Sequence, residues 1–341
     1  MKHLLLSLAL MAAVMGFSAC DQLSVIDEAE EGSITFSLGG MAANIETKAS
    51  STTAETYESQ VNNVQVFIFN GSGAFIKYGR ANANSVTITK VPAGTYTVAA
   101  VVNCSTDLSA TASLSALKAT AVTLGDNSTT AATGFRMYGE KSSVTVAAGS
   151  NSESIDVYRL PARVTLVSIT NGVTGGAKTV VAKAAILING RGSWQLSAAE
   201  SATTVEVNPA GRKSGTIITT AANATYADLT FADLGSTSCA AGGTAFGNRF
   251  YSFPKAEVTP DKYGTETGGN VRLSVLATVN GTDYWYPVTI NGVEKNKAYD
   301  VRLTITGAGS DDPNTPPVSG SLTATVSVKD WVAGTEYTET I

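Results

Sequence analysis

The sequence predicts an all-β protein with two antiparallel β-sandwich domains of the transthyretin-like, Greek-key type and a few short helices. Many short segments alternate apolar and polar residues, which is the pattern of strands with one buried face. Gly, Asn and Pro separate these segments, as turns require. Charged residues make up only 15% of the 341 residues, and a chain of this length is enough for about two ordinary domains.

The N-terminus predicts export. Lys2 precedes an apolar run from Leu4 to Val14, which is too short to span a bilayer and therefore indicates a secretory signal over residues 1–19. Ser18-Ala19-Cys20 is similar to a bacterial lipobox, in which the Cys20 thiol receives diacylglycerol and the new amino terminus a fatty acyl chain such as palmitate. The alternative is a plain secreted protein in which this cysteine is coincidental.

The next segment predicts a strand followed by a polar stretch. An acidic tether over residues 21–32 leads to an alternating run with Ile34, Phe36 and Leu38 on one face. Residues 42–60 are small and polar, and their one basic residue is Lys48.

The first sandwich domain is predicted over residues 49–157. It has a buried strand at 64–69, a Gly-rich turn, alternating strands up to residue 102, a short helix within 107–118, and strands near 144–146 and 155–157. Residues 158–341 form the second domain, whose clearest hairpin turns at Asn280-Gly281.

The C-terminus predicts a linker and then a strand. Residues 307–321 are rich in Gly, Ser, Asp and Pro and indicate a flexible linker. A strand with the same alternation as the first one follows, with Leu322, Ala324, Val326 and Val328 on one face; Trp331 comes soon after it.

The composition excludes several kinds of function. The single histidine, His3, lies in the signal segment, so the exported chain has no imidazole for a general base, a catalytic triad or a zinc site. We therefore predict that the protein is not an enzyme and has no catalytic residues, no metal and no cofactor. A net charge of −5 without a basic cluster argues against nucleic acid as a partner.

Three other groups of residues favour structural interpretations. Cys104 and Cys239 could form one bridge, but two separate buried thiols are the preferred interpretation. The Tyr284 to Tyr286 segment could stack on sugars, but cross-strand packing is favoured. Asp311, Asp312 and Asn314 could bind calcium, but they lack the ligand spacing of a calcium loop, and a solvated linker is favoured.

Taken together in their order along the chain, several motifs resemble the fimbrillin family of Bacteroidales type V pilins, of the major fimbrial subunit type. They are the lipobox at Cys20, Glu46-Thr47-Lys48-Ala49, the 64–69 strand, Val91-Pro92-Ala93-Gly94-Thr95-Tyr96, Leu160-Pro161-Ala162-Arg163-Val164, Asn296-Lys297-Ala298-Tyr299-Asp300-Val301 and Val326-Ser327-Val328-Lys329-Asp330-Trp331.

The resemblance implies a fimbrial subunit that reaches the outer membrane as a lipoprotein and polymerises by donor-strand exchange. It also implies that residues 20–48 are a propeptide with a removable strand, which is cleaved off between Lys48 and Ala49. Many family members carry Arg at the cleavage site, and an Arg-specific protease would not suit Lys48. Residues 322–341, with Leu322, Ala324, Val326, Val328 and Trp331, are the expected donor. They would fill the groove that is left when the strand with Ile34, Phe36 and Leu38 departs.

The expected partners are neighbouring copies of the chain, other fimbrial subunits, the outer membrane through the lipid before cleavage, and a host or bacterial surface ligand in adhesion. Two alternatives stay open. One is a glycan-binding surface lipoprotein that keeps its lipid and its first strand. The other is an anchor or tip subunit of the same fimbria.

Overall fold

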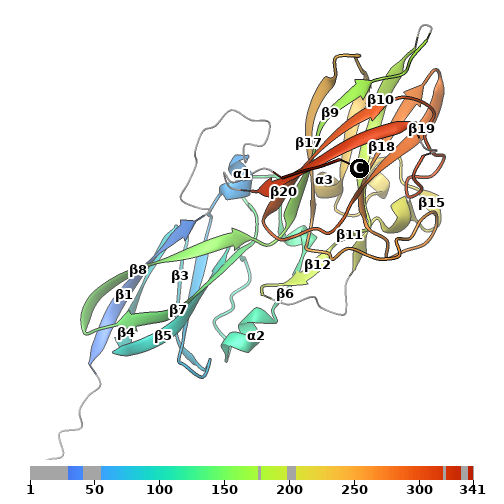
Figure 1. Cartoon of the computed structure of the whole chain (residues 1–341). Helices are drawn as coiled ribbons and strands as arrows, with labels where there is room; N and C mark the ends of the chain where they lie inside the picture. The colour runs from blue at the N-terminus through green and yellow to red at the C-terminus, as the bar shows by residue number, and fades with distance from the viewer. Residues whose placement is uncertain are drawn as a thin grey trace, which may run out of the picture.

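The computed structural model describes residues 30–40, 55–175, 178–197, 205–317, 320–331 and 337–340. The strands form two lobes arranged end to end in an elongated molecule (Figure 1). We call the region where the two lobes meet the lobe junction. Within the described ranges, no helix is long and apolar enough to cross a membrane.

The N-terminal lobe contains one curved sheet. Its strands lie in the order β3-β2-β5-β7-β8-β1-β4. β7 and β8 pair at only two positions, so the sheet folds into a layer β3-β2-β5-β7 and a layer β8-β1-β4. The bounds are β1 Glu31–Gly40, β2 Val64–Phe69, β3 Phe75–Ala81, β4 Ser85–Pro92, β5 Gly94–Val102, β7 Met137–Val146 and β8 Gly149–Arg159.

The C-terminal lobe contains a sheet β16-β10-β18-β19 and a sheet β17-β9-β20-β21-β22. The chain enters this lobe between β8 and β9. The bounds are β9 Ala162–Asn171, β10 Val180–Ile188, β16 Phe231–Ser238, β17 Thr244–Ser252, β18 Val271–Val279, β19 Thr282–Ile290, β20 Lys297–Ile305, β21 Leu322–Asp330 and β22 Tyr337–Thr340.

Short elements complete the structure. The helices are α1 Thr56–Ser59, α2 Leu114–Lys118 and α3 Ala227–Thr230, with 3-10 turns at Leu124–Asp126, Pro209–Gly211 and Ala221–Asn223. The small strands are β6 Ala121–Thr123, β11 Gly190–Arg191, β12 Ser193–Gln195, β13 Glu206–Val207, β14 Arg212–Lys213 and β15 Thr216–Ile217. The predicted helix within 107–118 is therefore shorter than expected and begins at the Ser113 cap.

The two lobes repeat one topology. Counting the main strands along each lobe, one layer has the order third, second, fifth, sixth, and the other has the order seventh, first, fourth. β1 and β9 occupy the first position in their lobes, and β8 and β20 occupy the seventh. β21 and β22 have no counterpart in the N-terminal lobe and extend the C-terminal sheet beyond β20. They are therefore an addition to a sandwich that already has its seven strands.

The predicted all-β sandwich class is confirmed, but the sheets are not purely antiparallel. β1 runs parallel to β8, and β9 runs parallel to β20. These are the same two positions of the repeated topology. Local alternation reveals which face of a strand is buried but not the direction of its neighbour, so the sequence could not indicate the parallel pairs.

Three large apolar cores run along the molecule. One fills the N-terminal lobe, a second fills the C-terminal lobe, and a third lies at the lobe junction and takes side chains from both lobes, including Phe69, Phe135, Phe253 and Trp331. β6 also pairs with β12 across the junction. Cys104 and Cys239 are free, buried thiols in separate cores, as the preferred interpretation expected.

The predicted linker over residues 307–321 is not free along its whole length, and this expectation was wrong. The Ser310 backbone forms a bridge with Trp285, and Asn314 is fully buried, where its side chain bonds to Arg272 at 2.7 Å and Asn189 at 2.9 Å. Asp312 pairs with Arg212. Composition misses these contacts because the partners come from distant parts of the chain.

The Tyr284 to Tyr286 segment forms part of β19. Tyr286 is buried in the C-terminal core, and Trp285 is buried on the other face against isoleucines of β10. Both rings are covered by packing, as the favoured interpretation expected, and they offer no platform for a sugar.

Candidate functional site

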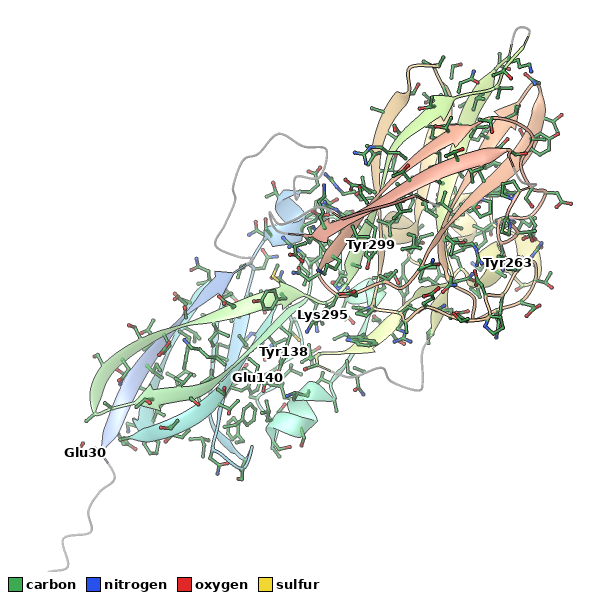
Figure 2. The ribbon with its side chains drawn as sticks, viewed as in Figure 1. Glu30, Tyr138, Glu140, Tyr263, Lys295 and Tyr299 are labelled. Carbon is green, nitrogen blue, oxygen red and sulfur yellow. The ribbon has the colours of Figure 1, made fainter. Side chains whose placement is uncertain are left out.

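β1 is the first part of the candidate site. It lies between two strands, parallel to β8 from Gly32 to Gly40 and antiparallel to β4 from Glu31 to Ser37. It starts at the tip of the N-terminal lobe, near Glu30 (Figure 2), and ends near the lobe junction, where Gly40 pairs with Val157. Both backbone edges of β1 are thus used by the surrounding sheet.

The side chains of β1 divide between the two faces as predicted. Ile34, Phe36 and Leu38 are buried in the N-terminal core, with exposed fractions of 0%, 1% and 8%. On the other face, the Thr35 hydroxyl hydrogen-bonds to that of Thr87 at 2.8 Å. Without β1, β8 and β4 would have no partner on this side and the core would lose three large side chains.

One glycine fixes how closely β1 packs. A Cβ atom at Gly32 would lie 2.1 Å from the carbonyl oxygen of Ala147, which is far inside contact distance. A strand that replaced β1 in the same register would need glycine or a shift at this point. The slot therefore imposes a steric condition in addition to its three apolar pockets.

β21 and β22 are the second part of the candidate site. β21 pairs antiparallel with β20 over nine residues, and β22 pairs with the other edge of β21. Ala324 and Val326 are buried in the C-terminal core, while Leu322 and Val328 are partly buried against it. The predicted alternation is thus present, and it is used within the same subunit.

The opposite face of β21 is less open than its sequence suggests. Ser327 is buried next to Asp300 of β20, whose carboxylate pairs with Lys329 at 3.1 Å. Thr323 is exposed and Thr325 half-buried. Thr323 and Thr325 are therefore better positions than Ser327 for control substitutions on this face.

Trp331 ends this stretch inside the lobe junction. Its side chain is 4% exposed and stacks on Tyr251 with ring centres 5.8 Å apart, while Phe135 meets it edge-on at 5.9 Å. The guanidinium groups of Arg159 and Arg163 lie 4.8 Å and 5.3 Å from its ring centre, within cation–π range. Trp331 is thus the residue that attaches the end of β21 to both lobes.

Glu58 of α1 organises the charges around Trp331. It is fully buried, and one carboxylate oxygen accepts hydrogen bonds from Arg163 at 2.8 Å and from the Trp331 indole at 3.2 Å. The other oxygen accepts one from the Tyr251 hydroxyl at 2.7 Å, and Arg159 donates to the backbone carbonyl of Glu58. A buried carboxylate is tolerated when it is paired and hydrogen-bonded in this way.

The pKa values of two groups next to Glu58 are shifted by burial. Desolvation raises the pKa of Tyr251 well above its usual value, and the charge of Glu58 raises it further, so its hydroxyl remains a donor. Burial lowers the pKa of Arg159 to about 10, at which the guanidinium still carries its charge at neutral pH. We call Glu58, Arg159, Arg163, Tyr251 and Trp331 the junction cluster.

Sequence analysis missed the junction cluster. Glu58 lies in a small, polar stretch, and its burial depends on residues from four distant segments. The one available signal was the pair of arginines that flank Leu160-Pro161 in an otherwise weakly charged chain, because buried arginines require a carboxylate.

Other predicted site residues lie outside the described residues. These are the lipidation residue Cys20 and the cleavage residues Lys48 and Ala49. Their roles stay predictions. The described chain resumes at Glu55, one residue before α1.

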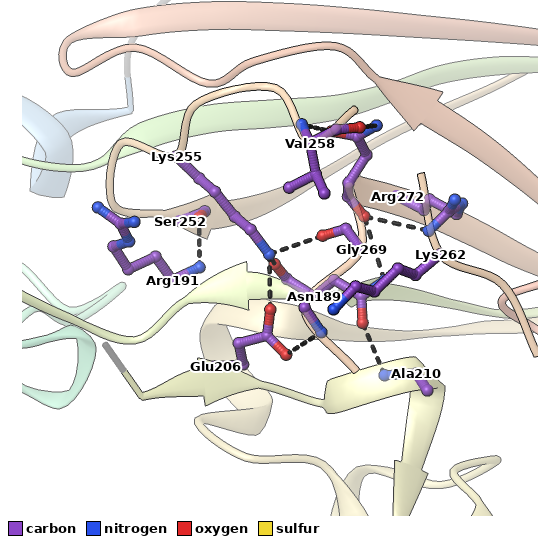
Figure 3. A network of polar contacts seen from close by, with 12 residues as sticks. Asn189, Arg191, Glu206, Ala210, Ser252, Lys255, Val258, Lys262, Gly269 and Arg272 are labelled. Carbon is purple, nitrogen blue, oxygen red and sulfur yellow. Dashed lines mark hydrogen bonds and ion pairs between the residues drawn. The ribbon is translucent and has the colours of Figure 1, made fainter. Parts of the chain in front are cut away.

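A second polar network in the C-terminal lobe contains the one described lysine that is buried (Figure 3). The Lys255 ammonium donates to Glu206 at 2.6 Å and to the carbonyls of Asn189 and Gly269 at 2.7 Å each. Burial lowers the pKa of Lys255, while Glu206 opposes this shift. All three donors are in use, which suits a structural role. Among the described residues, no group of three or more His, Cys, Asp or Glu side chains is placed to hold a metal ion.

A model of the family described as fimbrillin-A associated anchor proteins Mfa1 and Mfa2 matches residues 27–336. Among solved structures, a protein assigned to cell adhesion from Bacteroides eggerthii is 20% identical, with a TM-score of 0.64 over 89% of this chain and 97% of that one.

Two fimbrial proteins of Porphyromonas gingivalis are also similar in structure. A fimbrilin is 13% identical, with a TM-score of 0.62 over 90% of this chain and 99% of that one. The tip fimbrial protein Mfa3 is 13% identical, with a TM-score of 0.51 over 88% of this chain and all of that one. At these identities the likeness is one of fold.

Proposed function

Because this chain belongs to the family of fimbrillin-A associated anchor proteins, a family of fimbrial proteins, we propose that it is a structural subunit of a cell-surface fimbria that polymerises by donor-strand exchange. The observation that carries this proposal is the contrast between the two lobes. The N-terminal lobe needs β1 to complete its set of seven strands, and the C-terminal lobe carries a hairpin, β21 and β22, beyond its seven.

In this proposal the acceptor is the slot of β1. When β1 departs, the pockets of Ile34, Phe36 and Leu38 are uncovered. Burying each such side chain contributes about 1.5–3 kcal/mol. It also leaves the facing edges of β8 and β4 unpaired, and unpaired edges recruit strands. An incoming strand restores both the apolar packing and the backbone hydrogen bonds.

The proposed donor is the segment 322–341 of a neighbouring copy. Its Leu322, Ala324, Val326 and Val328 have the period that the slot requires. The hairpin can leave without removing any of the seven strands of its own sandwich. Residues 310–315 are held by the buried contacts of Asn314 and Asp312, so the part of the chain that moves with the donor begins after Thr315.

Processing prepares the acceptor. We propose that Cys20 carries the lipid in the precursor and that cleavage between Lys48 and Ala49 separates β1 from α1. Lys48 is the one basic residue between the end of β1 at Gly40 and the start of the described chain at Glu55. A non-enzymatic role fits this assembly. It also fits Lys255, whose three ammonium donors are all hydrogen-bonded.

A second candidate function is the anchor subunit of the same fimbria, and the description of the matching family favours it. An anchor keeps its lipid and its own β1, and it ends the polymer at the membrane. The two functions therefore differ in the N-terminal residue of the protein recovered from fibres.

The test compares sheared fibres with the membrane fraction by N-terminal peptide mass spectrometry. A stalk subunit gives Ala49 in fibres, whereas an anchor gives acylated Cys20 at the membrane. Lys48→Ala should keep the chain lipidated and reduce fibre. Normal fibres that still contain β1 would rule out strand exchange at this slot.

A trans experiment tests the donor directly. The monomeric chain that begins at Ala49 and keeps its own hairpin, so that the edge of β20 is occupied, is mixed with a peptide of residues 322–341, and its melting temperature is measured. We expect the peptide to raise it. The matched peptides are Val326→Thr, which places a hydroxyl in an apolar pocket, and Thr325→Val on the opposite face. If the two variant peptides raise the melting temperature equally, or if neither raises it, the assigned donor face is wrong.

A further inference from the structure

We propose that the hydrogen bond between Glu58 and Trp331 holds the C-terminal hairpin on its own subunit until the N-terminal segment has been cleaved. The inference rests on the proposed function, since it concerns when the donor is released. Glu58 joins the two segments that the proposed function involves: it lies in α1, the first described element after residues 41–54, and it binds Trp331, the residue that follows β21.

The direction of release makes Trp331 the controlling contact. The hairpin stays attached to its subunit through Leu322, so in leaving it must give up every contact on the far side of that residue. β22 lies at the edge of the sheet, paired with β21. Trp331, the described residue that follows β21, is deeply buried and fixes the end of β21 that lies farthest from Leu322. Its contacts with Tyr251 and Glu58 must open before Val326 can move.

The Glu58 side of this contact depends on α1. A four-residue helix has no stability of its own, so α1 stays in place through its tertiary contacts. These are the bonds of Glu58 to Arg163 and Tyr251, and the ion pair of Glu55 with Arg249. The hydroxyls of Tyr57 and Tyr251 also meet at 3.2 Å.

Cleavage changes how α1 is tethered. In the precursor, α1 is held between β1 upstream and β2 downstream. After a cut before Ala49 it lies within seven residues of a chain end, and segments near chain ends open more often than segments fixed on both sides. Each opening of α1 removes the acceptor of the Trp331 indole. The junction cluster therefore links removal of the old strand to release of the new one.

Hydrogen exchange measured by mass spectrometry tests the contact on the monomeric precursor, without requiring polymer. Trp331→Phe keeps an aromatic ring and removes the indole donor. We expect amides of 322–331 to exchange about ten- to a hundredfold faster, as the loss of a hydrogen bond to a charged group implies, while β18 and β19 stay unchanged. Trp285→Phe is the matched control, because Trp285 is equally buried in a different cluster.

A second variant removes the acceptor. Glu58→Gln keeps the shape of the side chain and should accelerate the same amides. If Trp331→Phe and Glu58→Gln leave the 322–331 amides at the wild-type rate, or accelerate every strand of the C-terminal lobe alike, Trp331 is an ordinary core residue and the proposal is wrong.

The coupling is tested by comparing the precursor with the chain that begins at Ala49. We expect faster exchange at 322–331 in the shorter chain, and equal rates would overturn the link to cleavage. The 322–331 amides could exchange faster in a chain that never forms detergent-resistant ladders. That result would contradict donor-strand exchange, but Trp331 would still be the residue that holds the hairpin in place. The two failures are thus distinguishable.

Discussion

Phe36→Ala should destabilise the precursor strongly and leave the assembled fibre unchanged. Phe36 sits in the middle of β1 with 1% of its surface exposed, inside the N-terminal core. Truncating a buried phenylalanine to alanine costs about 3–5 kcal/mol, since both the transfer free energy and the cavity contribute. In a fibre built by strand exchange, β1 is absent, so the substitution has nothing to act upon.

The assay measures the two states separately. Guanidinium unfolding of the precursor, followed by far-UV circular dichroism, gives the loss in free energy of unfolding. Heat dissociation of fibres assembled from the same variant gives the stability of the polymer. The control is Thr35→Ala, which removes the bond to Thr87 on the outer face and should cost the precursor about 0.5–1.5 kcal/mol.

Two results would refute this reasoning. If Phe36→Ala fibres lose heat stability in proportion to the precursor, β1 remains in the fibre and strand exchange does not occur at this slot. If the Phe36→Ala precursor is no less stable than the Thr35→Ala precursor, β1 is not part of the N-terminal core in which the structure places it.

Three further predictions address other parts of the chain. Glu58→Ala should lower the free energy of unfolding by about 3–5 kcal/mol, because it leaves Arg163 buried without its carboxylate; calorimetry measures this. Val326→Thr should cost about 1–3 kcal/mol and reduce fibre yield, whereas Thr325→Val should change stability by at most about 0.5 kcal/mol. Lys183 holds the pKa of Asp283 below its usual value. The pKa of Asp283 is thus lower in the folded state, so the pair stabilises the fold above the unfolded pKa of about 4, and this stability is lost as the pH falls through the folded pKa. Because Asp283 is half-exposed, the loss is at most about 1 kcal/mol. Acid denaturation curves of Asp283→Asn should lack this loss.

Local alternation was enough to predict the strands with one buried face. The β18–β19 hairpin pairs Val271 with Ile290 through to Val279 with Thr282 across Asn280-Gly281, as its sequence predicts, because turn type and alternation fix the register together. The same holds for Ile34, Phe36 and Leu38, whose burial follows from period two alone.

Features that depend on distant partners could not be predicted. The local sequence predicts that Glu58 is exposed, because nothing within its own segment distinguishes it from Glu55. Asn314 reads as a linker residue because Gly, Ser, Asp and Pro surround it, yet Arg272 and Asn189 hold it in the interior. The repeated strand order of the two lobes leaves no repeated sequence that would reveal it, because different apolar residues satisfy the same topology.

The shared core and the β6–β12 pair at the lobe junction have a mechanical consequence. In a fibre assembled by the proposed strand exchange, tension would enter each subunit through the strand in the N-terminal slot and leave through the C-terminal hairpin, along the long axis in Figure 1. The strands at both places run along that axis, so pulling loads their hydrogen bonds in shear, all at once, instead of opening them one by one. The junction has apolar packing from both lobes and a strand pair across it, so the subunit should stretch little before a strand slips.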